Sequence, residues 1–138
     1  MYVNKAANQY AAVNRQTGVE GANPHQLIQM LYEGAIENMA RAKGCMERKD
    51  FAGKGDTLGR AINIIGGLQS FLDKEKGGEI AENLDSLYDY MARRLFEASA
   101  NNDTEIIDEI IGLVREVKTG WEGIKDEAGK IFETTPSV

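Results

Sequence analysis

The chain has 138 residues, of which 42% are apolar, and it carries a formal net charge of −6. This length suits one domain with one hydrophobic core, and the apolar content excludes a wholly disordered chain. The chain is acidic and contains no long basic stripe. This argues against nucleic acids and anionic membrane surfaces as partners.

The sequence also predicts a cytoplasmic location. No apolar run is long enough to span a bilayer, so we expect no membrane insertion, and the first ten residues lack the apolar stretch of a signal peptide. Cys45 is the single cysteine, so it cannot form a disulfide within the chain. A reducing compartment is the simplest setting for it.

Residues 1–22 precede the first clear helix signal. They contain few large apolar side chains and end in a glycine-containing stretch, so we predict a short helix and a linker that form a mobile N-terminal cap. Asn23, Pro24 and Gln26 then form a helix start, because Asn can cap, Pro suits the first helical position and Gln can reach back. The apolar spacing from Leu27 onward predicts a helix that continues to about residue 48.

Three further helices follow with short connections. Asp50 is placed to cap a second helix, which the pair Gly77-Gly78 is expected to end. The expected core residues of the third helix are Ile80, Leu84, Leu87, Met91, Leu95 and Ala98. A cap pattern at residues 102–105 starts the fourth helix. We therefore predict an all-α fold, an antiparallel up-down four-helix bundle over residues 23–132, with a short N-terminal helical cap and a disordered tail at 133–138.

The residue types that catalysis needs do not occur in suitable combinations. His25 is the single histidine, which excludes a histidine relay within one chain. Cys45 has no base nearby in sequence, which favours a buried structural thiol over a nucleophile. Glu82, Asp85 and Asp89 share one side of the third helix, where a solvated face is the main interpretation and a carboxylate metal site a weaker alternative. With no phosphate-binding loop either, we predict no enzyme activity, no cofactor and no metal ion.

Apolar side chains also occur outside the main stripe of every predicted helix. On helical wheels these residues are Tyr32, Ile36, Ile64, Phe71, Tyr88, Tyr90, Phe96 and Ile111. Such residues either widen a core or form a docking surface, and their recurrence favours an apolar exterior that binds helices. Many of the fifteen glycines fall inside the predicted helices, which favours close helix packing or shallow grooves.

A family resemblance covers nearly the whole chain. It rests on the segments NPHQLIQMLYEGA (residues 23–35), MLYEGAIENM (30–39), AINII (61–65) and EKGGEIAENLDSLYDYMARRLFEAS (75–99), together with Tyr10 and Trp121. In this order they resemble the flagellar secretion chaperone family known as FliS, with Gly66-Gly67 as a mild departure. The resemblance implies a helical bundle in the bacterial cytoplasm that binds newly made flagellin, delays its polymerisation and delivers it to the flagellar type III export gate.

The resemblance further implies that the client is the C-terminal segment of flagellin, which becomes helical when bound, and that an export gate protein is a second partner. The residues expected to contact the client are Tyr10, Ile28, Tyr32, Ile36, Ile64, Leu68, Phe71, Tyr90, Phe96 and Ile111. Phe71 and Phe96 are expected to be exposed aromatics. Tyr10 is expected to plug a client groove, with a permanent fifth helix as the alternative.

One other function stays open, a structural homo-oligomeric bundle without a client. The sequence also leaves open whether the chain forms a homodimer and which groove receives which part of the client.

Overall fold

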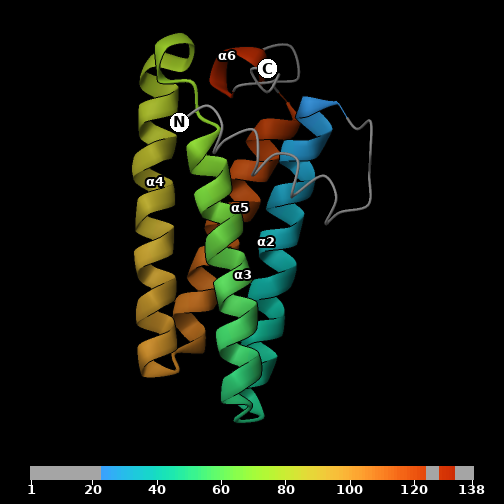
Figure 1. The fold of residues 1–138 in the computed structure, drawn as a ribbon, viewed down its shortest axis with the longest axis vertical. Helices are drawn as coiled ribbons and strands as arrows, with labels where there is room; N and C mark the ends of the chain where they lie inside the picture. Colours follow the sequence, from blue (N-terminus) through green and yellow to red (C-terminus); the bar gives the residue numbers. More distant parts are fainter. Residues whose placement is uncertain (1–22, 124–127, 133–138) are drawn as a thin grey trace.

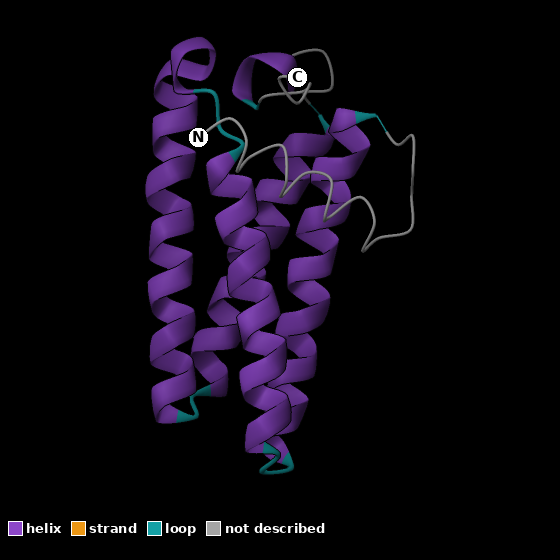
Figure 2. Cartoon of the chain, viewed as in Figure 1, coloured by secondary structure: helices purple, strands orange, loops and turns teal. Residues whose placement is uncertain are grey.

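The computed structural model describes residues 23–123 and 128–132, so the predictions for the leader and for the tail concern other parts of the chain. Four long helices make up most of the described chain: α2 (Pro24–Glu47), α3 (Phe51–Ser70), α4 (Lys74–Asn101) and α5 (Thr104–Glu122). A short helix, α6 (Ala128–Ile131), follows α5. Figure 2 shows the long helices side by side, with no strand in the described part.

Consecutive long helices run in opposite directions around a common core (Figure 1). α2 lies beside α3 and α5, and α4 lies beside the same two helices, so the four close into a ring. The prediction of an all-α four-helix bundle is confirmed, whereas the predicted N-terminal helical cap falls outside the described residues. Within the described chain, no helix combines the length and the apolarity that crossing a membrane requires.

Side-chain caps fix where the helices begin. The Asn23 side chain accepts a hydrogen bond from the backbone N–H of Gln26 (2.8 Å), and the Gln26 side chain accepts one from the N–H of Asn23 (3.3 Å). This is the predicted capping box. Asp50 caps α3 through the N–H of Gly53, and Asp103 caps α5. All three predicted helix starts are therefore confirmed.

The connection between α3 and α4 differs from the prediction. α3 ends at Ser70, before the expected glycine pair, because Asp73 caps a new helix through the N–H of Lys76. Gly77 and Gly78 instead lie inside α4, where Gly78 adopts φ of 51° and ψ of −129°. Glycine tolerates this positive φ at little cost, so the pair breaks α4 after its first turn rather than ending α3.

Apolar side chains from all four long helices form one core. The second half of the predicted α4 stripe is confirmed, since Met91, Leu95 and Ala98 are buried. In the first half the core face is rotated, because Ala81 and Tyr88 are buried whereas Ile80 is 51% exposed and Leu84 is half-buried. Ile80 is exposed because it precedes Ala81 by one residue, which places it about 100° around the helix from the core face. Tyr88 is accommodated in the core because its hydroxyl finds a partner there.

Candidate functional site

The ten residues predicted to contact a client differ widely in exposure. Five lie in the core: Ile28, Tyr32, Leu68, Phe71 and Ile111. Three are half-buried: Ile36, Ile64 and Tyr90. Phe96 is 62% exposed, as expected, and Tyr10 lies outside the described residues. Among the described candidates, Phe96 is the side chain most available to a partner.

The expectation that Phe71 is an exposed aromatic is wrong, because its side chain is buried. Phe71 keeps helical φ and ψ, and its N–H donates to the Gly67 carbonyl oxygen (3.1 Å), so it continues the wheel of α3. Its burial comes from its place at the end of the bundle, next to Leu72, which pairs with Phe132. Ile111, for which a widened core was one interpretation, is a core residue because α5 packs between α2 and α4. Contact between a client and the five buried side chains requires the bundle to open, and it stays a prediction.

Tyr32 and Tyr88 form a buried polar contact between α2 and α4. Their hydroxyl oxygens lie 2.5 Å apart, so one hydroxyl donates a hydrogen bond to the other. Burial raises the pKa of both phenols, so both stay neutral at physiological pH. The pair therefore ties α2 to α4 across the core.

A different surface lies where α3 and α4 meet, and we call it the α3–α4 seam. At one end, the Gln69 amide of α3 donates a hydrogen bond to the Asp85 carboxylate of α4 (2.8 Å). At the other end, the Lys54 ammonium of α3 donates hydrogen bonds to the backbone oxygen of Ser99 (3.0 Å) and to the side-chain oxygen of Asn102 (2.8 Å). These polar contacts identify the faces on which the two helices meet.

Small residues line the α3 side of the seam between these contacts. One face of α3 carries residues spaced at intervals of four, three and four: Gly55, Gly59, Ile62 and Gly66. By this spacing they share the helix face that carries Gln69. A Cβ atom built on any of the three glycines would meet no atom within 4 Å, so open space lies beside them. Ile62 is partly buried and packs against the core from the same face.

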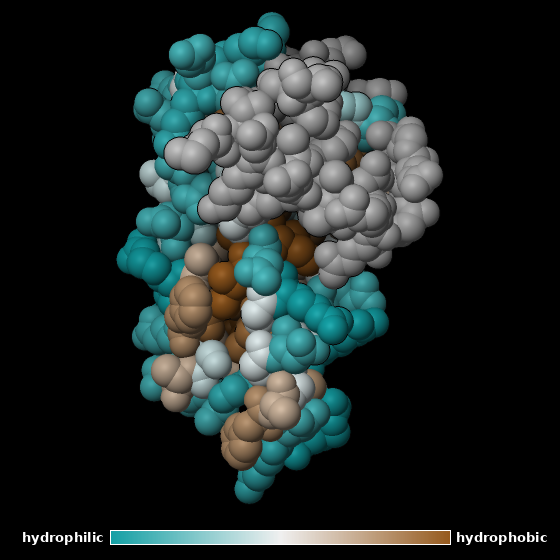
Figure 3. Space-filling model, in the orientation of Figure 1, coloured by the Kyte–Doolittle hydropathy of each residue, from teal (hydrophilic) through white to brown (hydrophobic). Residues whose placement is uncertain are grey.

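Phe96 lines the α4 side of the seam. It lies three helical turns after Asp85 and one turn before Ser99, so it shares the face that meets α3. Figure 3 shows apolar side chains, in brown, gathered between the two helices on this side of the molecule. The seam therefore combines an exposed aromatic ring on α4 with three positions on α3 where a Cβ atom would meet nothing within 4 Å.

Charged groups close the opposite side of α4. Arg94 donates hydrogen bonds to Glu109 of α5 (2.8 Å) and to Glu97 (2.7 Å), and the Tyr90 hydroxyl also donates to Glu109. The Tyr90 hydroxyl and the Arg94 guanidinium hold the pKa of Glu109 below its usual range. Tyr90, a predicted client contact, is thus already engaged by its own chain.

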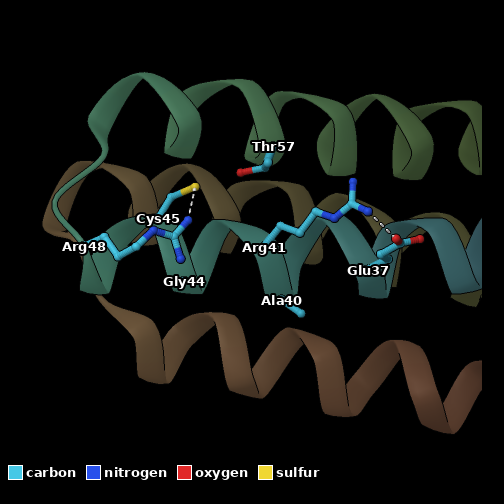
Figure 4. Close-up of a pocket in the computed structure, with 7 residues that line it drawn as sticks. All are labelled: Glu37, Ala40, Arg41, Gly44, Cys45, Arg48 and Thr57. Carbon is cyan, nitrogen blue, oxygen red and sulfur yellow. Dashed lines mark hydrogen bonds and ion pairs between the residues drawn. The ribbon is translucent and has the colours of Figure 1, made fainter.

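A concave feature on α2 carries no candidate chemistry (Figure 4). Its lining residues are Glu37, Ala40, Arg41, Gly44, Cys45, Arg48 and Thr57. Arg41 pairs with Glu37 (2.6 Å), and an Arg48 nitrogen lies 3.7 Å from the Cys45 sulfur. The charged groups are thus satisfied locally, and Cys45 is the buried free thiol that the sequence predicts.

His25 makes structural contacts with the end of α5. Its ring stacks on Trp121 with the centroids 4.8 Å apart, its Nε2 lies 2.8 Å from the Trp121 carbonyl oxygen, and Trp121 Nε1 donates to the His25 carbonyl oxygen (2.9 Å). Asp85, one carboxylate of the weaker metal alternative, is engaged by Gln69 and Lys74, and both hydrogen bonds lower its pKa. Within residues 23–123 and 128–132, no three potential metal ligands come together.

The α3–α4 seam was not predicted as a unit. The sequence indicates close helix packing or shallow grooves from the glycines inside the predicted helices, and it marks Phe96 by its place on one helical wheel, but nothing in it joins the two. The spacing of Gly55, Gly59, Ile62 and Gly66 is the signal in the sequence that could have revealed it. That signal becomes specific only when α4 is known to lie beside this face.

Comparison with known proteins gives consistent matches along the chain. The profile of the family described as "Flagellar protein FliS" matches residues 6–128. The flagellar secretion chaperone FliSB of Pseudomonas aeruginosa is 52% identical over 124 residues, which covers 90% of this chain and 98% of that protein. The flagellar secretion chaperone FliS of Salmonella typhimurium is 46% identical over 129 residues, covering 93% and 96%. The FliS of Vibrio cholerae is 40% identical over 118 residues, covering 86% and 87%.

Proposed function

Since this chain belongs to the FliS family of flagellar proteins, we propose that it is an export chaperone whose client is the C-terminal segment of flagellin. The family is one of chaperones and not of enzymes, in agreement with the sequence prediction. In this proposal the protein binds newly made flagellin in the cytoplasm and delays its assembly into filaments. It then passes the client to a protein of the flagellar export gate.

The observation that carries the proposal is the exposed Phe96 ring beside the glycine-lined face of α3. From Gly55 to Gly66 the seam follows three turns of α3, roughly 17 Å at the helical rise per residue. A client helix of similar length fits along it with its apolar face over Ile62 and Phe96. The missing side chains at the glycines allow its axis to approach α3 closely.

A client that folds on binding suits such a surface. A free amphipathic segment is disordered because it cannot bury its apolar stripe alone, and the same stripe drives premature assembly. Docking on the seam covers the stripe while the segment becomes helical. The ordering cost keeps the affinity moderate, so competing assembly can release the client by mass action without a nucleotide.

A synthetic peptide with the sequence of the flagellin C-terminal segment tests the proposal. Calorimetry is expected to show saturable binding with a negative heat-capacity change, and circular dichroism is expected to show helix gained on mixing. A scrambled peptide of the same composition is the control. Equal binding of the two peptides contradicts the proposal.

Light scattering after size-exclusion chromatography separates the chaperone from the structural homo-oligomer. A chaperone is expected to gain the mass of the peptide. A stable oligomer whose mass and elution do not respond to the peptide supports the structural bundle instead.

A further inference from the structure

The end of the chain that the structure describes crosses the bundle where α3 turns into α4. We call residues 130–132 the strap. The Asp73 backbone N–H donates a hydrogen bond to the Ile131 carbonyl oxygen (2.9 Å), and Leu72 and Phe132 form an isolated antiparallel bridge. Ile131 and Phe132 are both buried. The strap is therefore the end of α6 and the residue that follows it, held by backbone pairing and by two apolar side chains.

The surface under the strap is shaped for close approach of a backbone. A Cβ atom on Gly77 would lie 3.0 Å from the Lys130 carbonyl oxygen and 3.3 Å from the Ile131 Cα, so the strap packs directly on α4 there. The Phe132 ring meets Trp121 edge to face, with the centroids 5.1 Å apart and the planes at 88°. The strap thus joins the first turn of α4 to the end of α5.

The elements under the strap have little stability of their own. Gly66 and Gly67 lie in the last turns of α3, and glycine inside a helix is unfavourable relative to alanine. The first turn of α4 is isolated from the rest of the helix by the break at Gly78. A single turn of helix is not stable alone, so tertiary contacts hold it in place, and the strap supplies several of these.

Leu68 and Phe71, two residues predicted to contact the client, lie beside this junction and are covered by the protein itself. Leu68 and Phe71 are buried, and Phe71 directly precedes Leu72, the partner of Phe132 in the bridge. A client reaches such side chains only when the end of the bundle opens.

We infer that the strap is a gate within the chain: its release loosens the α3–α4 junction and exposes Leu68 and Phe71 to the client. The inference rests on the proposed function, since the client is the flagellin C-terminal segment. The closed strap keeps these apolar side chains covered when no client is present. Client affinity then depends on the fraction of molecules in which the strap is open.

A reversible lock on the strap tests the gate. Residues paired across an antiparallel bridge lie within the Cα separation that a disulfide spans, so Leu72→Cys and Phe132→Cys are combined in a Cys45→Ala background. The oxidised form is expected to bind the flagellin peptide at least about tenfold more weakly than the reduced form of the same protein. Equal affinities overturn the gate, whereas no binding by any form, wild type included, overturns the proposed function itself.

A second pair of variants removes the dependence on the engineered disulfide. Phe132→Ala weakens the strap and is expected to bind the peptide several-fold more tightly than wild type. Leu58→Ala removes a buried side chain from another part of α3 and controls for general loosening, so it is expected to gain no affinity. An equal gain in both variants overturns a role specific to the strap.

Amide hydrogen exchange reports on the strap without any client. The Asp73 amide is protected by the Ile131 carbonyl oxygen, so it is expected to exchange through a local opening, faster than the amide of buried Ile65 in α3. Phe132→Ala is expected to speed exchange at Asp73 more than at Ile65, because Asp73 reports the local opening as well as the loss of global stability. Exchange of both amides only through global unfolding contradicts a gate.

Discussion

Filling the α3–α4 seam with a side chain is expected to raise stability and to lower client affinity at the same time. Gly59→Leu places a long side chain where a Cβ atom meets nothing within 4 Å, so the folded bundle accommodates it without a clash. Replacing an interior helical glycine by a good helix former stabilises a protein by up to about 1 kcal/mol. For a domain of this size that corresponds to a melting temperature higher by about 2–5 °C.

The effect on binding has the opposite sign. A leucine at residue 59 occupies the space that a client helix needs along α3, and forcing extra methylenes into a packed contact costs about 1–3 kcal/mol. Affinity for the flagellin peptide should therefore fall by a factor of roughly 5 to 150. Thermal melts followed by circular dichroism and calorimetric titration measure the two effects on the same sample.

Gly112→Leu is the matched control. Gly112 is an exposed glycine inside α5, and a Cβ atom there also meets nothing within 4 Å. It should give a similar gain in melting temperature and leave peptide binding unchanged, because it lies outside the seam. Wild-type affinity in Gly59→Leu, or an equal loss in both variants, refutes the assignment of the seam as a client surface.

Four further outcomes are expected. The exposed 62% of Phe96, about 120 Å² of a ring-bearing side chain, is worth at most about 3 kcal/mol on burial. Phe96→Ala should therefore weaken peptide binding by up to about a hundredfold in calorimetry, while Ile80→Ala, exposed but off the seam, should not. Because the folded-state pKa of Glu109 is lowered by Tyr90 and Arg94, its stabilising contribution is present above the unfolded pKa of about 4.3 and lost as pH falls through the lower folded pKa. Urea unfolding of Glu109→Gln should accordingly show a shallower acid loss than wild type, and parallel pH profiles contradict this. Tyr88→Phe leaves the Tyr32 hydroxyl unpaired in the core and should cost about 1–3 kcal/mol in urea unfolding, and adding Tyr32→Phe should recover part of that loss. Deleting residues 1–18 should leave peptide binding equal or tighter if Tyr10 plugs the groove; weaker binding at an unchanged melting temperature means that the leader contacts the client directly.

Local signals in the sequence identified most helix starts and the fold class. The Asn23 capping box and the Asp50 and Asp103 caps depend on residues within one turn of each other, so a single sequence reveals them. Gly77-Gly78 was misinterpreted because a glycine pair marks either a helix end or a kink. The choice between them depends on the Asp73 cap and on the strap that packs against Gly77.

Burial near helix ends and between helices was harder to predict. Phe71 keeps helical φ and ψ, yet it is buried because it lies at the bundle end, where Leu72 pairs with the distant Phe132. Tyr88 entered the core because Tyr32, far away in sequence, supplies its hydrogen-bond partner. Half of the candidate site could be predicted: one helical wheel finds an exposed Phe96, but only the placement of α4 beside α3 brings it to the face that carries the glycines.

The glycines of α3 separate two physical roles. A Cβ atom on Gly53 would lie 2.8 Å from the Cys45 sulfur, so packing within the chain accounts for that glycine. Gly55, Gly59 and Gly66 have open space instead, and nothing in the described chain requires them to lack a side chain.

Each of these three glycines costs up to about 1 kcal/mol of helix stability, which is a sizeable share of the 5–15 kcal/mol typical of a whole domain. Open space alone does not identify a partner site, because Gly112 of α5 has it as well. The three glycines differ from Gly112 in sharing the face of α3 beside α4, which suits the client helix that we propose. Alanine at these positions would stabilise the free protein. It would also add one methyl group to the α3 side of the seam at each of the three positions. In the proposed function the cost falls on the free protein, and the expected gain appears only when the client is bound.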